Sequence, residues 1–152
     1  MNFWLFKSEP DEYSIDDLAN EPNATGRWDG IRNYQARNLI RDDIKIDDKV
    51  LFYHSSCKDV GVAGIAKVVS APYPDPSQFE PNNKYYDEKS TESNPRWFCV
   101  DIAFEHKAKH FLSLKEIKHT DELSEMTLVK QGRLSIQPVS AMEWNYINQR
   151  IS

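Results

Sequence analysis

Two short polar segments carry the side chains that are best suited to chemistry. His54 and Ser55 follow an apolar stretch, and a histidine beside a serine could act as a general base, although a buried structural histidine would give the same pattern. Trp28 stands between Gly26 and Gly30, where an aromatic ring could stack on a ligand or simply anchor a loop. Both segments are therefore candidate binding positions, and the first is also a candidate catalytic one.

The residue patterns of common catalytic and metal sites are missing. The chain has no Gly-x-Ser-x-Gly for an activated serine, and no His-x-Glu followed by Cys-x-x-Cys for a zinc deaminase. Gly61 and Gly64 lack the further glycines and the lysine of a phosphate-binding loop. His106 and His110 are four residues apart, but their segment is strand-like and the ligand set is incomplete. The sequence thus predicts a protein that is not an enzyme and holds no metal and no cofactor.

The charge of the chain limits how it could meet nucleic acid. With 24 acidic and 19 basic residues the net charge is -5, whereas affinity for a phosphate backbone comes from lysine and arginine. The basic residues are unevenly spread, because four arginines lie between 27 and 41 and four lysines between 107 and 118, with Lys130 and Arg133 further on. These segments either meet in one basic face or remain scattered over the surface.

Hydrophobic patterning predicts the elements that must position these side chains. Short apolar or β-branched runs predict strands at 3–6, 49–54, 61–69 and 97–106, of which the second and third form a hairpin. Capping residues and apolar faces predict short helices after Ser14, over 31–40, near 123–128 and after Ser140. A helical turn or an edge strand is expected near 112–117. Residues 20–30 are expected to form a loop, and the proline-rich 71–95 a long irregular excursion.

Strands separated by short helices and long loops predict one mixed α/β domain over residues 1–152, built round a curved sheet or small barrel. The N-terminal residues form neither a signal peptide nor a spanning segment, so we expect a cytoplasmic protein with no membrane partner. Cys57 and Cys99 have no metal-type spacing and are expected to be reduced thiols. We expect the protein to be a monomer.

Six blocks of the sequence resemble the EVE family in order and spacing. They are Trp4–Pro10, Trp28–Asn38, Phe52–Ser55, Gly64–Val68, Tyr73–Asp75 and Leu128–Val139. The EVE family is related to PUA-like and YTH domains, and the match covers nearly the whole chain. The resemblance implies a PUA-like pseudobarrel of about five to six strands with short surrounding helices.

The resemblance also implies non-catalytic binding of a modified nucleobase, such as methylated or hydroxymethylated cytosine, in DNA or RNA. A base offers two π-faces and a polar edge, so a selective pocket needs aromatic walls and a few placed donors and acceptors. The partner would be a nucleic acid whose modified base is single-stranded or flipped out. The matched blocks offer Trp28, Tyr34 and Tyr53 as walls, whereas the apolar neighbours of Trp4 favour the core for that ring.

Polar side chains of the same blocks could meet the edge of the base or a phosphate. The candidates for the edge are Ser8, Asn33, His54, Ser55, Ser135 and Gln137. The cations Lys7, Arg32 and Arg133 could face a phosphate or the base itself. Ser8 and Asn33 also have simpler readings, as a turn residue and as a helix cap.

Three other functions stay open. A free nucleotide or another small aromatic molecule could occupy the same pocket without needing a basic surface. The proline-rich residues 71–95 could instead be the contact surface of an interaction module. A hydrolase that acts on a modified base is the remaining alternative, although the motifs above argue against it.

Overall fold

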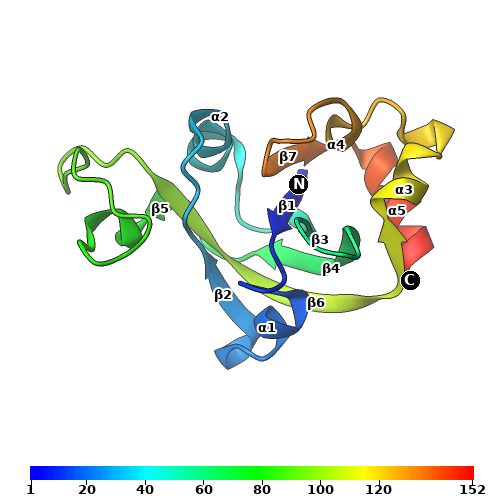
Figure 1. Cartoon of the computed structure of the whole chain (residues 1–152), viewed down its shortest axis with the longest axis horizontal. Helices are drawn as coiled ribbons and strands as arrows, with labels where there is room; N and C mark the ends of the chain where they lie inside the picture. Colours follow the sequence, from blue (N-terminus) through cyan, green and yellow to red (C-terminus); the bar gives the residue numbers. More distant parts are fainter.

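One seven-stranded mixed sheet organises the chain, and the computed structural model describes all of residues 1–152 (Figure 1). The strands are β1 (Phe3–Ser8), β2 (Thr25–Trp28), β3 (Lys49–His54), β4 (Gly61–Val68), β5 (Tyr73–Pro74), β6 (Phe98–Ser113) and β7 (Ile136–Val139). They lie in the order β2-β6-β4-β3-β1-β7, and β5 pairs with β6 off this path. Only β1 and β3 are parallel neighbours, and all other pairs are antiparallel.

Short helices surround the sheet. They are α1 (Ile15–Ala19), α2 (Tyr34–Asn38), α3 (Leu114–Lys118), α4 (Thr127–Lys130) and α5 (Ala141–Ile151), with single helical turns η1 (Pro22–Ala24), η2 (Leu39–Asp43), η3 (Pro76–Phe79) and η4 (Asp121–Leu123). The helix caps predicted at Ser14 and Ser140 are confirmed, since each serine accepts a hydrogen bond from the backbone N–H three residues later. None of these helices is long and apolar enough to cross a membrane.

Both faces of the sheet are covered, which gives the core two parts. Successive side chains of a strand point to opposite faces, so Phe6 and Phe52 join one cluster of 18 buried residues. Leu5 and Tyr53, one position along, join a second cluster of 14 that includes Trp144 of α5. Figure 1 shows α3, α4 and α5 gathered at one end of the molecule and the excursion around β5 at the other. The predicted mixed α/β fold class is confirmed.

The predicted loop at 20–30 is wrong, because β2 lies inside it. Thr25–Trp28 pairs with β6, and Trp28 lies opposite Val100. A side chain at Gly26 would collide with the hydroxyl of Tyr13, so the glycine that suggested a loop instead permits close packing of a strand. The strand depends on its partner β6, which no local pattern could indicate.

Other boundaries differ by a few residues. The strand predicted at 97–106 is β6, which continues to Ser113 through two irregularities in its pairing with β4. The helix predicted at 31–40 starts only at Tyr34, because Asn33 caps it, and it continues through the π-helical turn η2. Near 112–117 the chain forms α3, the helical one of the two expected alternatives.

Candidate nucleic-acid interface

A cleft of about 770 Å³ opens where the parallel strands β1 and β3 end. The backbone N–H of Ser55, just after β3, donates to the carbonyl of Ser8 at the end of β1 (2.9 Å). Ligands commonly bind beyond the carboxyl ends of neighbouring parallel strands, because loops diverge there and leave a crevice. The volume suits one nucleoside-sized group rather than a duplex.

Seven of the twelve predicted site residues line this cleft. They are Lys7, Ser8, Trp28, Arg32, Ser55, Arg133 and Ser135. The structure adds others that the sequence did not single out, among them Tyr13, Arg27, Asp29, Lys84 and Tyr85. Five separate segments therefore meet at one place: the chain at the ends of β1, β2 and β3, the chain just before β7, and the excursion that carries Lys84 and Tyr85.

Trp28 forms part of the floor of the cleft rather than a free-standing wall. Its side chain is 7% exposed and packs at 5.3 Å between ring centroids against both Phe6 and Phe52. Tyr13 meets its edge at 6.3 Å, and burial raises the pKa of the Tyr13 phenol to about 12, which keeps that ring neutral. The floor is thus a rigid aromatic cluster that continues directly into the core.

Tyr85 supplies a half-exposed aromatic wall that the sequence prediction missed. The ring lies so close to Gly30 that a Cβ there would be 2.6 Å from it, and Gly30 has a φ of +79°. The guanidinium of Arg32 lies 5.4 Å from the centre of the ring. Tyr85 comes from the proline-rich excursion 71–95, so its position depends on how that excursion folds back on the sheet.

Arg32 holds the excursion against the loop after β2, and all five N–H groups of its guanidinium are already engaged within the chain. Its guanidinium donates to the carbonyls of Tyr85 and Ile31, to Ser77 Oγ and to Asp75 Oδ2 at 3.0 Å. Although burial opposes the charged form, hydrogen bonds from Ser77, Gly30 and Arg32 hold the pKa of Asp75 below its usual value. The pair is a buried connection between two loops, which differs from the phosphate contact that we expected of Arg32.

Two cations in the cleft have no carboxylate partner. The ammonium of Lys7 donates to the carbonyl of Gly132, and burial lowers the pKa of this lysine. Arg133 is exposed and forms no ion pair. By contrast, Arg27 pairs with Asp29 at 3.0 Å. Positive charge is therefore available at the β1–β7 side of the cleft.

The three serines differ in what they can offer a ligand. Ser8 Oγ already donates to the carbonyl of Tyr13 at 2.5 Å, where it closes the turn after β1. Ser55 and Ser135 line the cleft, and their hydroxyl groups form no hydrogen bond within the chain. A hydroxyl group can both donate and accept, so these two suit the polar edge of a base.

Five predicted site residues lie outside the cleft, each with a structural role. Asn33 caps α2 through its side-chain oxygen, and Gln137 is fully buried and donates to two carbonyls of the 131–134 turn. Tyr53 points to the opposite face of the sheet from Phe52. Tyr34 stacks on Trp97 at 4.8 Å.

His54 is the fifth, and its ring is engaged by the backbone. Its Nε2 accepts a hydrogen bond from the N–H of Ile15 at 3.1 Å, which ties the end of β3 to the start of α1. Burial lowers the pKa of this imidazole, in keeping with a neutral acceptor. His54 could be a general base or a buried structural histidine, and this geometry supports the structural role. No three His, Cys, Asp or Glu side chains lie close enough together to hold a metal ion.

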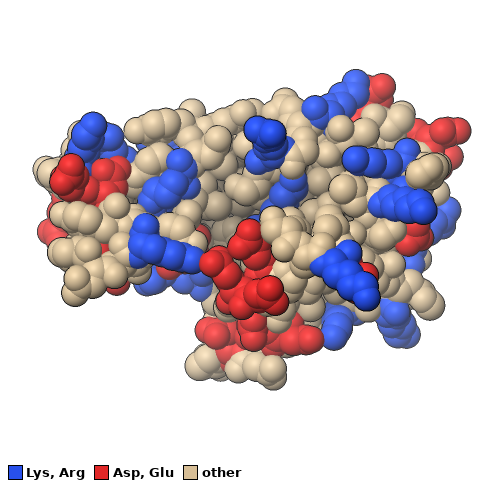
Figure 2. Space-filling model, viewed as in Figure 1, with Lys and Arg blue, Asp and Glu red and all other residues tan.

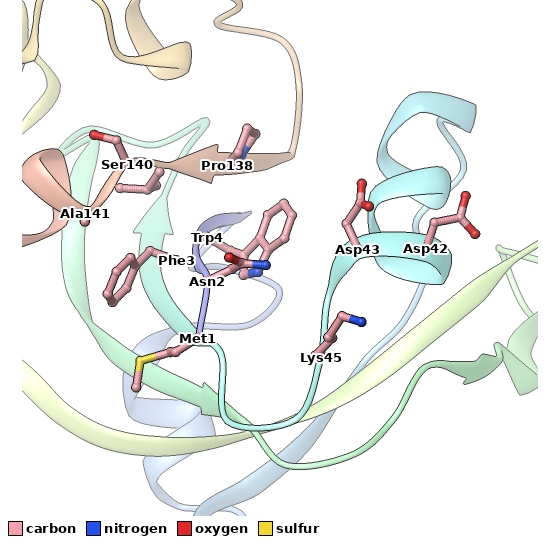
Figure 3. Close-up of a pocket in the computed structure, with 11 residues that line it drawn as sticks. Met1, Asn2, Phe3, Trp4, Asp42, Asp43, Lys45, Pro138, Ser140 and Ala141 are labelled. Carbon is pink, nitrogen blue, oxygen red and sulfur yellow. The ribbon is translucent and has the colours of Figure 1, made fainter.

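A second hollow of about 580 Å³ lies at the other end of β1. Figure 3 shows the rings of Phe3 and Trp4 turned in opposite directions there, with Pro138 on β7 and Asp43 on η2 nearby. Trp4 is 4% exposed and its indole N–H donates to the buried Asp48 at 2.9 Å, so it belongs to the core. None of the predicted site residues lines this hollow.

The sheet with its short helices and strand-end cleft defines a PUA-like domain of mixed α/β architecture. Residues 2–150 match the EVE domain, and the chain belongs to this family. The chain is 42% identical to thymocyte nuclear protein 1 of Mus musculus in an alignment that is 163 residues long. This alignment covers 96% of this chain and 72% of the mouse protein. The resemblance inferred from the six sequence blocks is confirmed.

Two solved structures resemble this chain in fold. The human THYN1 protein, crystallised in complex with 5-methylcytosine-containing DNA, superposes with a TM-score of 0.94 at 41% identity, covering 98% of this chain and 96% of that one. A YTH domain of Zygosaccharomyces rouxii superposes with a TM-score of 0.55 at 14% identity, covering 97% of this chain and 84% of that one. The second likeness concerns the fold alone, and it confirms the expected structural similarity to YTH domains.

Proposed function

We propose that this chain binds a modified base, in the first place 5-methylcytosine in DNA, within the cleft at the ends of β1 and β3, and does so without catalysing a reaction. The observation that carries the proposal is the likeness to the human THYN1 protein, which was crystallised with DNA containing that base. The cleft supports it with an aromatic floor and wall, two unpaired hydroxyl groups and two unpaired cations.

The size of the cleft favours a base that has left the helix. A cleft of about 770 Å³ lies in the size range of small-ligand pockets, so it can admit a single nucleotide but not a length of duplex. Such a base is either single-stranded or flipped out of the duplex, and a mismatched or unpaired position makes the flip less costly. Tyr85 and the exposed edge of Trp28 would contact its π-face, while Ser55 and Ser135 would contact its polar edge.

The methyl group alone gives limited discrimination. One buried CH₂-sized group contributes about 0.8 kcal/mol, which corresponds to roughly a fourfold preference. A greater preference for the methylated base requires that the unmodified base leave the cleft poorly packed.

A free nucleotide-like molecule is the second candidate, and the charge around the cleft favours it. Arg27, Arg32 and Lys84 are each paired with a carboxylate, which reduces the attraction for a long phosphate backbone. Such a ligand would bind with equal affinity whether or not further nucleotides are attached.

Fluorescence polarisation would separate these functions. The ligands are methylated and unmethylated oligonucleotides, single- and double-stranded, together with 5-methyl-dCMP, each at two salt concentrations. Tighter, salt-sensitive binding of a methylated oligonucleotide supports the reader. Equal binding of the mononucleotide with no salt dependence supports the small-molecule site, and no binding of any ligand contradicts both.

A further inference from the structure

Three lysines lie on two segments that are joined by a backbone hydrogen bond, and none of them forms an ion pair. Lys58 belongs to the loop between β3 and β4, and Lys115 and Lys118 lie three residues apart on α3. The N–H of Leu114 donates to the carbonyl of Val60 at 2.9 Å, which joins the loop to the start of α3. All three lysines are exposed, and none forms an ion pair. We refer to them as the lysine surface.

The lysine surface is continuous with the cleft. Ser55 and Ser56 line the cleft, and they begin the same loop that carries Lys58. An extended chain advances at most about 3.6 Å per residue, so the Cα of Lys58 lies within roughly 7 Å of that of Ser56. Because one strand of DNA carries a phosphate about every 3.4 Å along the helix axis, Lys58 lies within a few phosphates of a base in the cleft.

The segment that follows β1, which also borders the cleft, carries negative charge. Residues 9–21 contain six acidic side chains and no lysine or arginine. Glu9 and Glu12 of this segment line the cleft itself. Figure 2 shows acidic side chains gathered over the lobe that contains α1, whereas basic side chains outnumber the acidic ones over the part that contains α3. A phosphate backbone would be repelled on the α1 side and attracted on the α3 side.

Building on the proposed function, we infer that the nucleic-acid backbone flanking the bound base runs from the cleft over the lysine surface, and that the α1 side excludes it. The acidic segment thus favours a backbone that approaches the cleft from the side of α3. Sequence-independent binding stays weak because only a few phosphates are neutralised, and the base in the cleft decides the affinity.

A matched pair of double variants tests this path. Lys58→Gln/Lys115→Gln removes two charges from the lysine surface. Lys45→Gln/Lys89→Gln removes two from exposed lysines that also lack ion pairs but lie on other elements. Binding of a methylated duplex of about 14 base pairs and of 5-methyl-dCMP is measured by competition polarisation from 0.05 to 0.3 M salt, with circular dichroism to confirm folding.

The first variant should bind the duplex about tenfold more weakly at 0.1 M salt, and its salt slope should fall by about 2 because two phosphate contacts are lost. Its affinity for 5-methyl-dCMP should equal that of the wild type, and the second variant should keep the wild-type slope. Equal slopes for the two variants would overturn the lysine path while the proposed function stands. A wild-type protein that binds no methylated ligand would overturn both.

Discussion

Arg32 and Asp75 lie 43 residues apart in the chain and meet at 3.0 Å, with the carboxylate fully buried. The same carboxylate accepts hydrogen bonds from the backbone of Gly30 and from Ser77. This one group therefore fixes the loop after β2 against the excursion that carries Tyr85. The position of Tyr85, which forms the wall of the cleft, therefore depends on this ion pair.

Loss of the Asp75 charge should destabilise the fold. In Asp75→Asn the partly buried Arg32 loses its counterion, and breaking such a pair costs about 3–5 kcal/mol. Urea unfolding followed by tryptophan fluorescence would measure the change. Asp42→Asn, which breaks the exposed pair with Arg41, serves as the control and should leave the midpoint unchanged. Similar midpoints for both variants would show that the Arg32–Asp75 pair holds nothing in place.

Tyr85 and Tyr86 allow a matched test of the aromatic wall. Tyr85 lines the cleft, whereas Tyr86 is 43% exposed and does not. Tyr85→Ala should weaken binding of a methylated oligonucleotide by about 1–3 kcal/mol, the usual contribution of one base–aromatic stack. Tyr86→Ala should bind like the wild type. Equal losses would point to a disturbed excursion, and no loss for Tyr85→Ala would remove this ring from the site.

Gly30 should tolerate no side chain. Its φ of +79° is costly for other residues, and a Cβ would meet the Tyr85 ring at 2.6 Å. Gly30→Ala should lower the free energy of unfolding by about 1–2 kcal/mol for the backbone alone and also weaken ligand binding. Gly132→Ala, in the same cleft but with only Leu128 O within 3.8 Å of the new Cβ, should be nearly neutral. The prediction fails if thermal unfolding cannot distinguish the two variants.

Stability should fall as the solution is acidified below neutral pH. The pKa of His54 is lowered in the folded protein, so the unfolded chain, with a pKa near 6.5, binds more protons in that range. The free energy of unfolding therefore decreases as the pH falls from about 7 towards the folded-state pKa. His54→Gln should flatten this dependence in urea titrations, whereas His110→Gln, an exposed position, should not. An unchanged slope in His54→Gln would assign the effect to other groups.

The sequence predicts best what local patterns determine. β1, β3 and β4 are recognisable because their residues are apolar and β-branched, and α1 and α5 because Ser14 and Ser140 begin capping boxes. The strand around Trp28 could not be predicted in this way, since it forms by pairing with residues more than 70 positions away.

In the candidate site, too, local patterns predict some residues, whereas the positions of others depend on distant parts of the chain. Ser8, Ser55 and Trp28 follow or end strands, and they do line the cleft. Tyr53 does not line the cleft, because successive side chains of β3 point to opposite faces of the sheet and Tyr53 faces away from the side of Phe52. An error of one residue in predicting which positions face the cleft therefore selects the wrong side chain. Tyr85 and the partner of Arg32 depend on the path of a 25-residue excursion, which has no periodic pattern to read.

The pairing of β1 with both β3 and β7 has a consequence for synthesis. Lys7 donates its backbone N–H to the carbonyl of Ser135, and Phe3 lies opposite Val139. The cleft is thus bounded by the first and the last strands of this sheet in chain order, and closing so long a loop is slow and entropically costly. A nascent chain that has exposed β1 to β6 has much of its sheet but no complete binding site. The cleft is therefore complete only after β7 has been synthesised and has paired with β1.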